Sequence, residues 1–289
     1  MTKPMVTQWT QLHTALWSAS AKSVSPTAFH ASFQKSIHTK TGFKGFKQQD
    51  ASEFFALLVD GFHTALAREV SMTVRGTATT TTDKIAVQCY ETIKQMYSKD
   101  YSEMFPLFFG MYVSEIVSVA TKKTLSFKTD PYLELNLSIS STSAVTLKEC
   151  IDAHCAGETI EGYMNETTKQ PETVMRRIKF WSFPKVFVIA LKRFSNSNQK
   201  NNVAIDFPML LDMSPYSYHP CTKTYELYGV CQHMGGTAGG HYTACVKHAI
   251  TKEWYLFNDQ QVTHLNSGSV KATISRGAYC LFYQKYPKE

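Results

Sequence analysis

Features that the sequence lacks exclude several classes of protein. No hydrophobic run approaches the roughly 20 residues that a membrane-spanning helix needs, and the first residues lack the apolar core of a signal peptide. We therefore expect no membrane contact and a cytoplasmic or nuclear location. The basic residues, which give a formal net charge of +7, are spread out rather than clustered, so no nucleic-acid partner is predicted.

Cysteine is scattered, and no two cysteines form a CxxC pair. An odd, dispersed set is not typical of a disulfide framework and predicts reduced, buried thiols. Cys150, His154 and Cys155 lie close together on one predicted helix but have no fourth ligand nearby, so we predict neither a metal site nor a cofactor. The seven cysteines are Cys89, Cys150, Cys155, Cys221, Cys231, Cys245 and Cys280.

The first part of the chain has helical periodicity. Short apolar patterns predict helices at 6–18, 27–37 and 84–98. Asp50, followed by Glu53, is typical of a helix cap and opens the strongest predicted helix. The apolar stripe of that helix consists of Phe54, Leu57, Leu58, Phe62, Ala65 and Leu66.

From about residue 106 onward the pattern is typical of strands. Residues 133–139 alternate most clearly between apolar and polar side chains. Further strands are predicted at 174–181, 185–193, 225–233, 241–248, 253–258 and 278–284, with a short helix at 146–155. A helical first part and an antiparallel second part predict an α+β fold, and no linker divides the chain cleanly.

The predicted strands at 241–248 and 253–258 carry the strongest chemical signal. A short polar turn separates them, so antiparallel pairing centred near residue 250–251 would bring His241 close to Asn258. An imidazole that activates a thiol needs a partner to fix its tautomer and orientation. Asn258 can supply its side-chain oxygen, with Asp259 as an alternative or auxiliary partner. A hairpin that merely exposes His241 at the surface would explain the same spacing.

Four glycines precede His241, in the run Gly-Gly-Thr-Ala-Gly-Gly at 235–240. We interpret this run as a flexible loop with few side chains. Because glycine lets a backbone approach closely, such a loop suits a narrow channel for an extended peptide.

Four separated blocks then identify a family. They are FKQQDASEF at 46–54, FPKVFVIALKRF at 183–194, YELYGV at 225–230 with His233 and GGHYTA at 239–244, and 254–262 with AYCLFY at 278–283. In order and spacing these blocks resemble the ubiquitin-specific protease family of cysteine deubiquitinases, over nearly the whole chain.

The resemblance implies a papain-like fold with thumb, palm and fingers, in which 1–105 would form a partial helical thumb and 106–289 the palm and fingers. It also implies ubiquitin binding and hydrolysis at the C-terminal glycine of ubiquitin, with His241 as catalytic base and Asn258 as its orienting residue. Asp50 and Glu53 would pair with arginines of the ubiquitin tail, although a helix cap also explains them. The remaining residues that the resemblance assigns to ubiquitin binding are Gln49, Phe194, His233, Gly239, Gly240 and Tyr242, of which Phe194 could equally be core.

One departure from the family concerns the nucleophile. The family carries it before the Gln-Gln-Asp motif, in a run like Gly-Asn-Thr-Cys-Tyr, whereas residues 1–47 contain no cysteine. Cys245 is predicted to lie roughly 13 Å from His241 along the same strand, and neither Cys89 nor Cys280 is placed to face His241. We therefore predict that no other thiol replaces the nucleophile and that the chain as written is inactive.

The other departure concerns metal. Many members of the family hold a structural zinc with two CxxC pairs at the fingertips. Residues 117–122 and the pair Asn165 and Thr168 stand where those pairs are expected, so no thiolate remains and zinc is not predicted.

Two interpretations follow from these departures. The chain could be an incomplete deubiquitinase whose cysteine block lies upstream, which the retention of His241 and Asn258 favours. Alternatively, it is a catalytically dead ubiquitin-binding or scaffold subunit of a larger assembly, which the loss of the nucleophile and zinc ligands favours. Either way, the expected partners are ubiquitin or ubiquitinated proteins, together with other subunits of a complex.

Overall fold

The computed structural model describes residues 4–18, 23–37, 48–139, 143–195, 199–236, 239–275 and 277–286. Their contacts divide the chain into two units, Met1–Thr73 with Ile93–Phe105 and Val74–Thr92 with Pro106–Glu289. Helices and mixed sheets are both present, so the predicted α+β fold is confirmed. The division into thumb, palm and fingers remains a prediction. No helix in the described ranges is long and apolar enough to cross a membrane.

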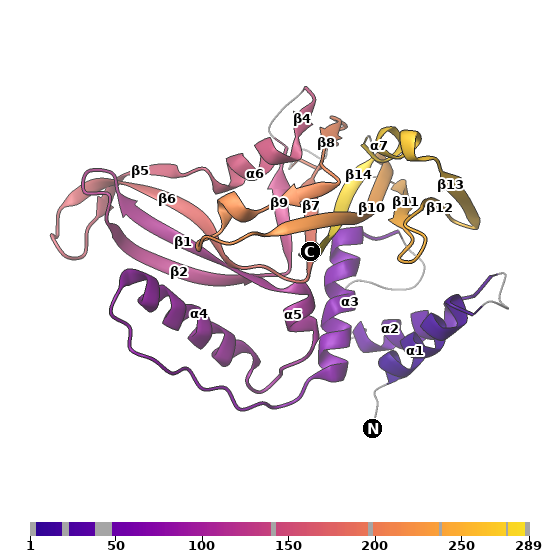
Figure 1. Cartoon of the computed structure of the whole chain (residues 1–289), viewed down its shortest axis with the longest axis horizontal. Helices are drawn as coiled ribbons and strands as arrows, with labels where there is room; N and C mark the ends of the chain where they lie inside the picture. The colour runs from indigo at the N-terminus through magenta and orange to yellow at the C-terminus, as the bar shows by residue number, and fades with distance from the viewer. Residues whose placement is uncertain are drawn as a thin grey trace. The chain divides into compact units, whose positions relative to one another are not determined.

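The first unit contains the helices α1 (Pro4–Leu16), α2 (Thr27–Ile37) and α3 (Ala51–Leu66), shown in indigo and violet in Figure 1. The predicted helix at 27–37 is confirmed with the same ends, and the one predicted at 6–18 is confirmed with its ends two residues earlier. Met5, Phe33 and Ile37 form the buried core of this unit, and the α3 stripe packs Leu57, Leu58 and Phe62 against it. The helices α4 (Thr81–Tyr97) and α5 (Met104–Phe108) each contribute residues to both units.

The second unit contains a four-stranded antiparallel sheet in the order β2-β1-β6-β5 (Figure 1). Its buried positions alternate along β1, as the period of a half-buried strand requires. The bounds are β1 (Gly110–Ser118), β2 (Thr124–Tyr132), β5 (Glu158–Met164) and β6 (Pro171–Ser182).

An eight-stranded sheet forms the centre of the same unit, with the order β13-β12-β11-β10-β14-β7-β3 and with β9 also paired to β10. Among its described strand pairs, β3 and β7 are the one pair that runs parallel. Its core includes Phe187, Tyr225 and Tyr283, whose side chains are fully buried. The bounds are β3 (Glu134–Ser138), β7 (Val186–Lys192), β9 (Leu210–Asp212), β10 (Thr224–Gly236), β11 (Gly239–Lys247), β12 (Trp254–Asn258), β13 (Gln261–Leu265) and β14 (Ala278–Lys285).

Shorter elements complete the second unit. β4 (Val145–Thr146) pairs in parallel with β8 (Ile205–Asp206), and a 3-10 turn, η1, covers Ser214–Tyr216. Helix α7 (Ser267–Ser275) lies between β13 and β14 in the chain. The Gln232 side chain of β10 bonds to this helix, donating from Nε2 to the Thr273 carbonyl at 2.7 Å.

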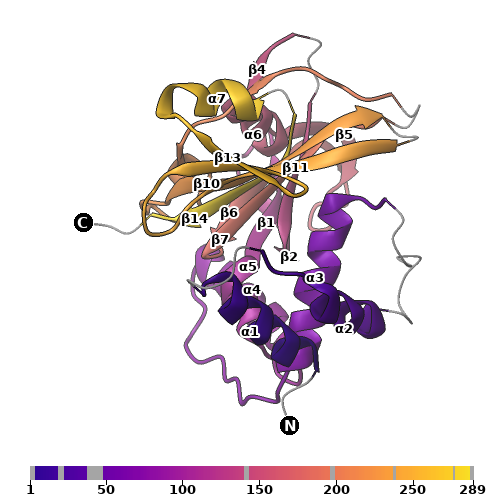
Figure 2. The same cartoon turned by 90° about the vertical axis from the view of Figure 1, so that its right-hand side faces the viewer.

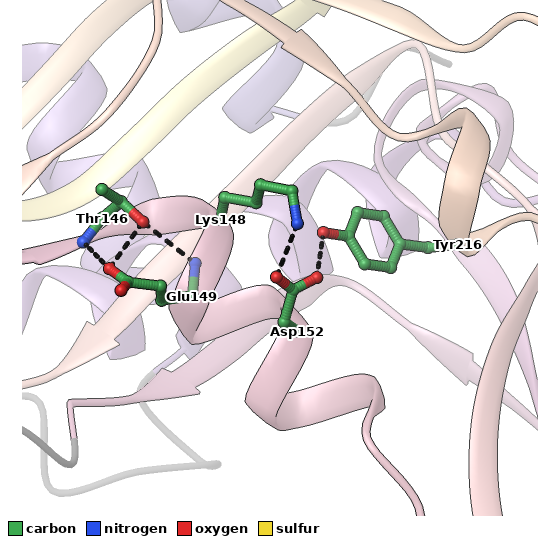
Figure 3. A network of polar contacts seen from close by, with 5 residues as sticks. All are labelled: Thr146, Lys148, Glu149, Asp152 and Tyr216. Carbon is green, nitrogen blue, oxygen red and sulfur yellow. Dashed lines mark hydrogen bonds and ion pairs between the residues drawn. The ribbon is translucent and has the colours of Figure 1, made fainter.

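Helix α6 (Leu147–Cys155) begins one residue later than predicted, because Thr146 caps it. Thr146 Oγ1 accepts from the Glu149 amide at 3.2 Å, and a Glu149 carboxylate oxygen accepts from the Thr146 amide at 2.7 Å (Figure 3). Asp152 accepts from Lys148 Nζ and from the Tyr216 hydroxyl, each at 2.6 Å. These bonds fix both the start of α6 and its position against the 3-10 turn.

Candidate functional site

The hairpin predicted from the sequence is present with the predicted register. β11 and β12 pair antiparallel from Lys247 opposite Trp254 to Ala244 opposite Phe257, which centres the hairpin between residues 250 and 251. In the large sheet β12 lies between β11 and β13, and β11 lies next to β10; β10, β11 and β13 are labelled in Figure 2. At the open end of the hairpin, His241 Nε2 lies 2.6 Å from Asn258 Oδ1.

This hydrogen bond determines which imidazole nitrogen can act as a base. A carboxamide oxygen only accepts hydrogen bonds, so Nε2 must carry the proton that it donates to Asn258. Nδ1 then keeps its lone pair in the neutral ring. The His241 side chain is 41% exposed, so a reacting group can approach this free nitrogen.

Asp259 takes a more distant position than Asn258. Its Oδ2 lies 3.9 Å from His241 Nε2, beyond hydrogen-bond range, and its side chain is 78% exposed. Asp259 has a left-handed backbone with φ of 50°, which starts the turn into β13. Of the two partners considered from the sequence, Asn258 is therefore the one that orients the ring.

All seven cysteines lie in the described part of the chain, and none of them hydrogen-bonds to the His241 ring. Cys245 is fully buried and donates to Gln232 Oε1 at 3.6 Å, and burial raises its pKa to about 11. Burial also raises the pKa of Cys89 to about 12. Cys280 is buried on β14, opposite Cys231 of β10.

A second group of the predicted residues forms an aromatic cluster. The His233 ring lies 5.6 Å from Phe194 and 4.7 Å from Tyr242 between centroids. Tyr279, which the sequence analysis did not single out, lies 6.0 Å from both His233 and Tyr242. Its position in the fourth block that resembles the family was a signal of a functional role. Its distance along the sequence from Phe194, His233 and Tyr242 gave no indication that the four rings are in contact.

His233 and Tyr242 are cross-strand partners, as are Met234 and His241. Because successive strand residues point to opposite faces, His241 and the aromatic cluster project from opposite faces of the β10–β11 hairpin. An open cavity of about 570 Å³ lies beside Asn258, and its lining includes Lys200, Gln232 and Gly277.

The structure corrects the flexible loop predicted at 235–240 for its four glycines, while Thr237 and Ala238 lie outside the described residues. Pairing of β10 with β11 continues as far as Gly236 opposite Gly239, so these glycines lie in strands. Gly240 packs so closely that a Cβ placed there would lie 2.1 Å from His233 Nε2 and 2.7 Å from the Met234 carbonyl. The predicted close approach of backbone is therefore present at Gly240, in a paired strand rather than a loop.

Gln49, Asp50 and Glu53 belong to the first unit. Asp50 caps α3, and its Oδ1 accepts from the amides of Ser52 at 2.9 Å and Glu53 at 3.0 Å. The capping explanation of Asp50 is thus confirmed, while ubiquitin contacts of these three residues stay a prediction. The Glu53 side chain is exposed.

A hydrogen-bond network occupies the position where the resemblance places fingertip zinc. Glu172 Oε2 accepts from Ser118 Oγ at 2.5 Å, and its Oε1 accepts from Asn165 Nδ2. Asn165 Oδ1 in turn accepts from the amides of Thr167 and Thr168. The network offers one hydroxyl, one amide and one carboxylate, and both carboxylate oxygens already accept hydrogen bonds, so these side chains do not fit a four-ligand zinc site.

Within the described ranges no three side chains of histidine, cysteine, aspartate or glutamate come together as a group that could hold a metal ion. Cys150 is buried, and burial lowers the pKa of His154 and raises that of Cys155 to about 12. The interpretation as partly buried core residues agrees with Cys150, which lies in the core, and with Cys155, which packs against it, whereas His154 is half-buried.

Comparison with known sequences connects the site to a family. A sequence model of the family described as "Ubiquitin carboxyl-terminal hydrolase" matches residues 2–283. Ubiquitin carboxyl-terminal hydrolase 2 of Gallus gallus is 32% identical over 98% of this chain and 81% of the relative. The Bos taurus protein of the same name is 30% identical over 97% of this chain, and Usp2 of Drosophila melanogaster is 28% identical over 96%. The chain spans only 47% and 30% of these two relatives.

Solved structures show the same fold. A chain of the SAGA DUB module bound to monoubiquitin has a TM-score of 0.75 at 22% identity, covering 100% of this chain and 60% of that chain. A yeast SAGA DUB module gives a TM-score of 0.74 at 22% identity, covering 99% and 59%. The observed arrangement of helices and sheets is therefore that of these DUB-module chains.

Proposed function

Because the chain belongs to the ubiquitin carboxyl-terminal hydrolase family, we propose that it binds ubiquitin and carries the base half of a thiol-hydrolase site. The observation that carries this proposal is the 2.6 Å hydrogen bond between His241 Nε2 and Asn258 Oδ1. It leaves Nδ1 as the proton acceptor that a thiol nucleophile requires. The substrate would be the thioester or isopeptide bond at the C-terminal glycine of ubiquitin.

The chemistry follows from the tautomer. A thiol placed at Nδ1 of His241 transfers its proton to the ring, and the thiolate attacks the carbonyl carbon of the glycine. The imidazolium, held by Asn258, then returns the proton to the leaving amine as the carbon–nitrogen bond breaks. Water, deprotonated by the same Nδ1, hydrolyses the thioester and releases the carboxylate and the thiol.

The thiol is the missing participant. The His241 ring has no thiol partner within the described ranges, and burial raises the pKa of Cys89 and Cys245. We infer that these 289 residues alone have negligible peptidase activity. Cleavage would require a cysteine block outside this sequence.

The binding part of the proposal rests on the aromatic cluster. Phe194, His233, Tyr242 and Tyr279 meet ring to ring, and Gly240 brings backbone against His233 without a side chain between. Phe194 and Tyr242 stay partly exposed beside the buried His233 and Tyr279, so an extended, glycine-rich tail could pack against these two rings, because glycine lets its backbone approach closely. Independently of this cluster, Asp50 and Glu53 are proposed to pair with arginines of the tail, and Gln49 to contact ubiquitin.

A second candidate function is a catalytically dead ubiquitin-binding or scaffold subunit. The absence of a thiol partner for His241 in the described chain favours it, and so does the Glu172 network in place of zinc ligands. This candidate needs the same binding surface but no nucleophile. Partner subunits would then account for the role of the protein in an assembly.

The test combines a titration with a reactivity assay. Ubiquitin is titrated into the chain by calorimetry, with ubiquitin lacking its C-terminal tail as the matched ligand. The chain is then incubated with ubiquitin carrying a C-terminal electrophile and analysed by mass spectrometry. Tail-dependent binding without labelling is the expected result. No measurable binding would refute the ubiquitin proposal, and labelling of any cysteine would refute the inferred inactivity.

The coding sequence upstream of Met1 distinguishes the two candidate functions. An in-frame block like Gly-Asn-Thr-Cys before Met1 would make the complete protein a thiol-dependent isopeptidase, and His241→Ala in it should abolish cleavage of isopeptide-linked ubiquitin. If no such block exists, tail-dependent binding supports the subunit role. If the chain does not bind ubiquitin, a scaffold role without ubiquitin binding is the remaining candidate.

A further inference from the structure

Arg193 is a buried cation that the proposed chemistry does not use. It is only 1% exposed and directly precedes Phe194 of the aromatic cluster. Within the described ranges no carboxylate forms an ion pair with it, and burial lowers its pKa. A buried guanidinium without a counter-charge is costly unless its donors are bonded, so its position calls for an explanation.

The guanidinium donates to three backbone carbonyls instead. Nε donates to the Ala278 carbonyl at 2.5 Å, and Nη1 donates to the carbonyls of Asn201 and Val203, each at 2.9 Å. Ala278 opens β14 and precedes Tyr279. One planar group thus joins the segment at 201–203 to the strand that carries Tyr279.

Three further contacts connect the same segment to Arg193, Phe194 and His233. The Asn201 amide donates to the Arg193 carbonyl at 2.7 Å, and Phe194 forms an isolated bridge with Lys200. Lys200 Nζ donates to the His233 carbonyl at 2.7 Å. The segment that leaves Arg193 and returns at Val203 is therefore tied at its base by Arg193 and to β10 by Lys200.

We propose that Arg193 is a positioning residue for the ubiquitin-binding surface. Its guanidinium fork holds the Phe194 segment and the Tyr279 strand at the spacing that sets both rings against His233. Arg193 itself does not touch the ligand. This role rests on the proposed function, but the clamp is a property of the chain that can be measured without ubiquitin.

Lysine cannot reproduce this clamp, although it keeps the charge. A lysine ammonium carries all its donors on one nitrogen at the end of a flexible side chain. The guanidinium of Arg193 is planar and rigid, and two of its nitrogens donate to carbonyls of two different segments. Arg193→Lys therefore separates the geometry of the fork from the presence of a positive charge. Ile151→Val is the matched control, since Ile151 is fully buried in the core of the same unit.

Three measurements on the full chain test the proposal. Hydrogen exchange reports the amides of 199–203, and NMR reports the His233 ring protons, whose shifts depend on ring currents from Phe194, Tyr242 and Tyr279. Calorimetry reports ubiquitin affinity, at a temperature where every variant is folded by circular dichroism. For Arg193→Lys we expect faster exchange, shifted His233 signals and about tenfold weaker binding. Ile151→Val should leave all three unchanged.

The outcomes separate this proposal from the proposed function. Unchanged exchange and unchanged His233 signals in Arg193→Lys would refute the clamp. Altered signals with unchanged ubiquitin affinity would refute the positioning role. If wild type does not bind ubiquitin, the proposed function fails, while the exchange and NMR data still decide the clamp. Should Arg193→Lys not fold, Lys200→Met removes the bond to His233 without changing the core, and it must shift the same signals for the proposal to hold.

Discussion

At the scale of single residues, the tautomer of His241 depends on one atom of Asn258, and the packing around His233 depends on the missing Cβ of Gly240. One hydrogen bond selects the tautomer of His241. One missing Cβ allows the β11 backbone to lie against the His233 ring. Both features can be tested with small substitutions.

Removing the Asn258 carboxamide should change the tautomer of His241. In wild type we expect the neutral ring to carry its proton on Nε2, because Asn258 Oδ1 accepts it at 2.6 Å. In Asn258→Ala this preference should weaken, and ¹⁵N NMR of the ring nitrogens measures it directly. Asp259→Asn is the control, since Asp259 lies 3.9 Å away and should not alter the tautomer. Equal effects of both substitutions would contradict the assignment of Asn258 as the orienting residue.

Adding one methyl group at Gly240 should disturb the aromatic cluster. The new Cβ would overlap His233 Nε2 and the Met234 carbonyl, and one of these is backbone that cannot move aside easily. We expect Gly240→Ala to lower the free energy of unfolding by about 1–3 kcal/mol, as overpacking does, and to weaken ubiquitin binding.

Gly236→Ala provides the comparison for this measurement. Among the described residues no atom lies within 4 Å of a Cβ at Gly236, and its φ is not in the left-handed region. Chemical denaturation should show a change within about 0.5 kcal/mol. If the two variants are equally stable, the close packing at Gly240 does not matter energetically.

At the scale of elements, the β11–β12 hairpin was predictable because its signals are local. Alternation along β11 and β12 and the polar turn between them fix the register, and the register alone brings His241 to Asn258. The four glycines at 235, 236, 239 and 240 were interpreted wrongly because glycine is typical of loops, whereas here they lie in paired strands and Gly240 permits close packing. β13 and α7 were not predicted: most of β13 is exposed, and α7 begins with Ser-Gly-Ser, so neither carries a clear apolar period.

The tips of β1–β2 and β5–β6 should be stabilised by the Glu172 carboxylate rather than by metal. Glu172 joins Ser118 of one tip to Asn165 of the other, and these hydrogen bonds lower its pKa. Glu172→Gln should therefore speed hydrogen exchange at both tips. Glu158→Gln, on the same sheet, should have little effect, because its ion pair with Arg176 is exposed. Comparable exchange in the two variants would contradict the role of Glu172.

The same lowered pKa gives a pH dependence with a definite sign. A carboxyl group whose pKa is lower in the folded state adds stability above its ordinary pKa. That contribution is lost as the pH falls through the lowered value. Protection of the tips should therefore decrease in acid for wild type, and less so for Glu172→Gln.

At the scale of the whole molecule, the fold class was predictable from the sequence, but the division of the chain into two contact units was not. The change from helical to strand period near residue 106 is visible in the sequence, and the α+β fold follows from it. By contrast, the second unit includes 74–92, a stretch that no local pattern connects to strands after residue 106. Arg193 illustrates the same limit, because its three acceptors are backbone carbonyls that sequence spacing cannot reveal.

The thiols provide a measurement on the whole chain. Cys89, Cys150, Cys245 and Cys280 are buried, so a thiol reagent should modify at most the other three quickly in the folded protein and all seven after denaturation. Burial raises the pKa of Cys89 and Cys245, so their thiols stay protonated when folded. Stability should accordingly fall as the pH rises above the ordinary pKa of cysteine, where the unfolded thiols ionise. Rapid native labelling of Cys245 would contradict this assignment.

The β11–β12 turn has a practical consequence for experiments on this protein. Ile250 at its tip is 74% exposed and lies at the opposite end of the hairpin from His241 and Asn258. Because the ladder between Lys247 and Trp254 sets the alignment, added residues at the tip should leave the two strands in step. A fluorescent reporter or an affinity handle inserted there could follow ubiquitin capture without occupying either terminus.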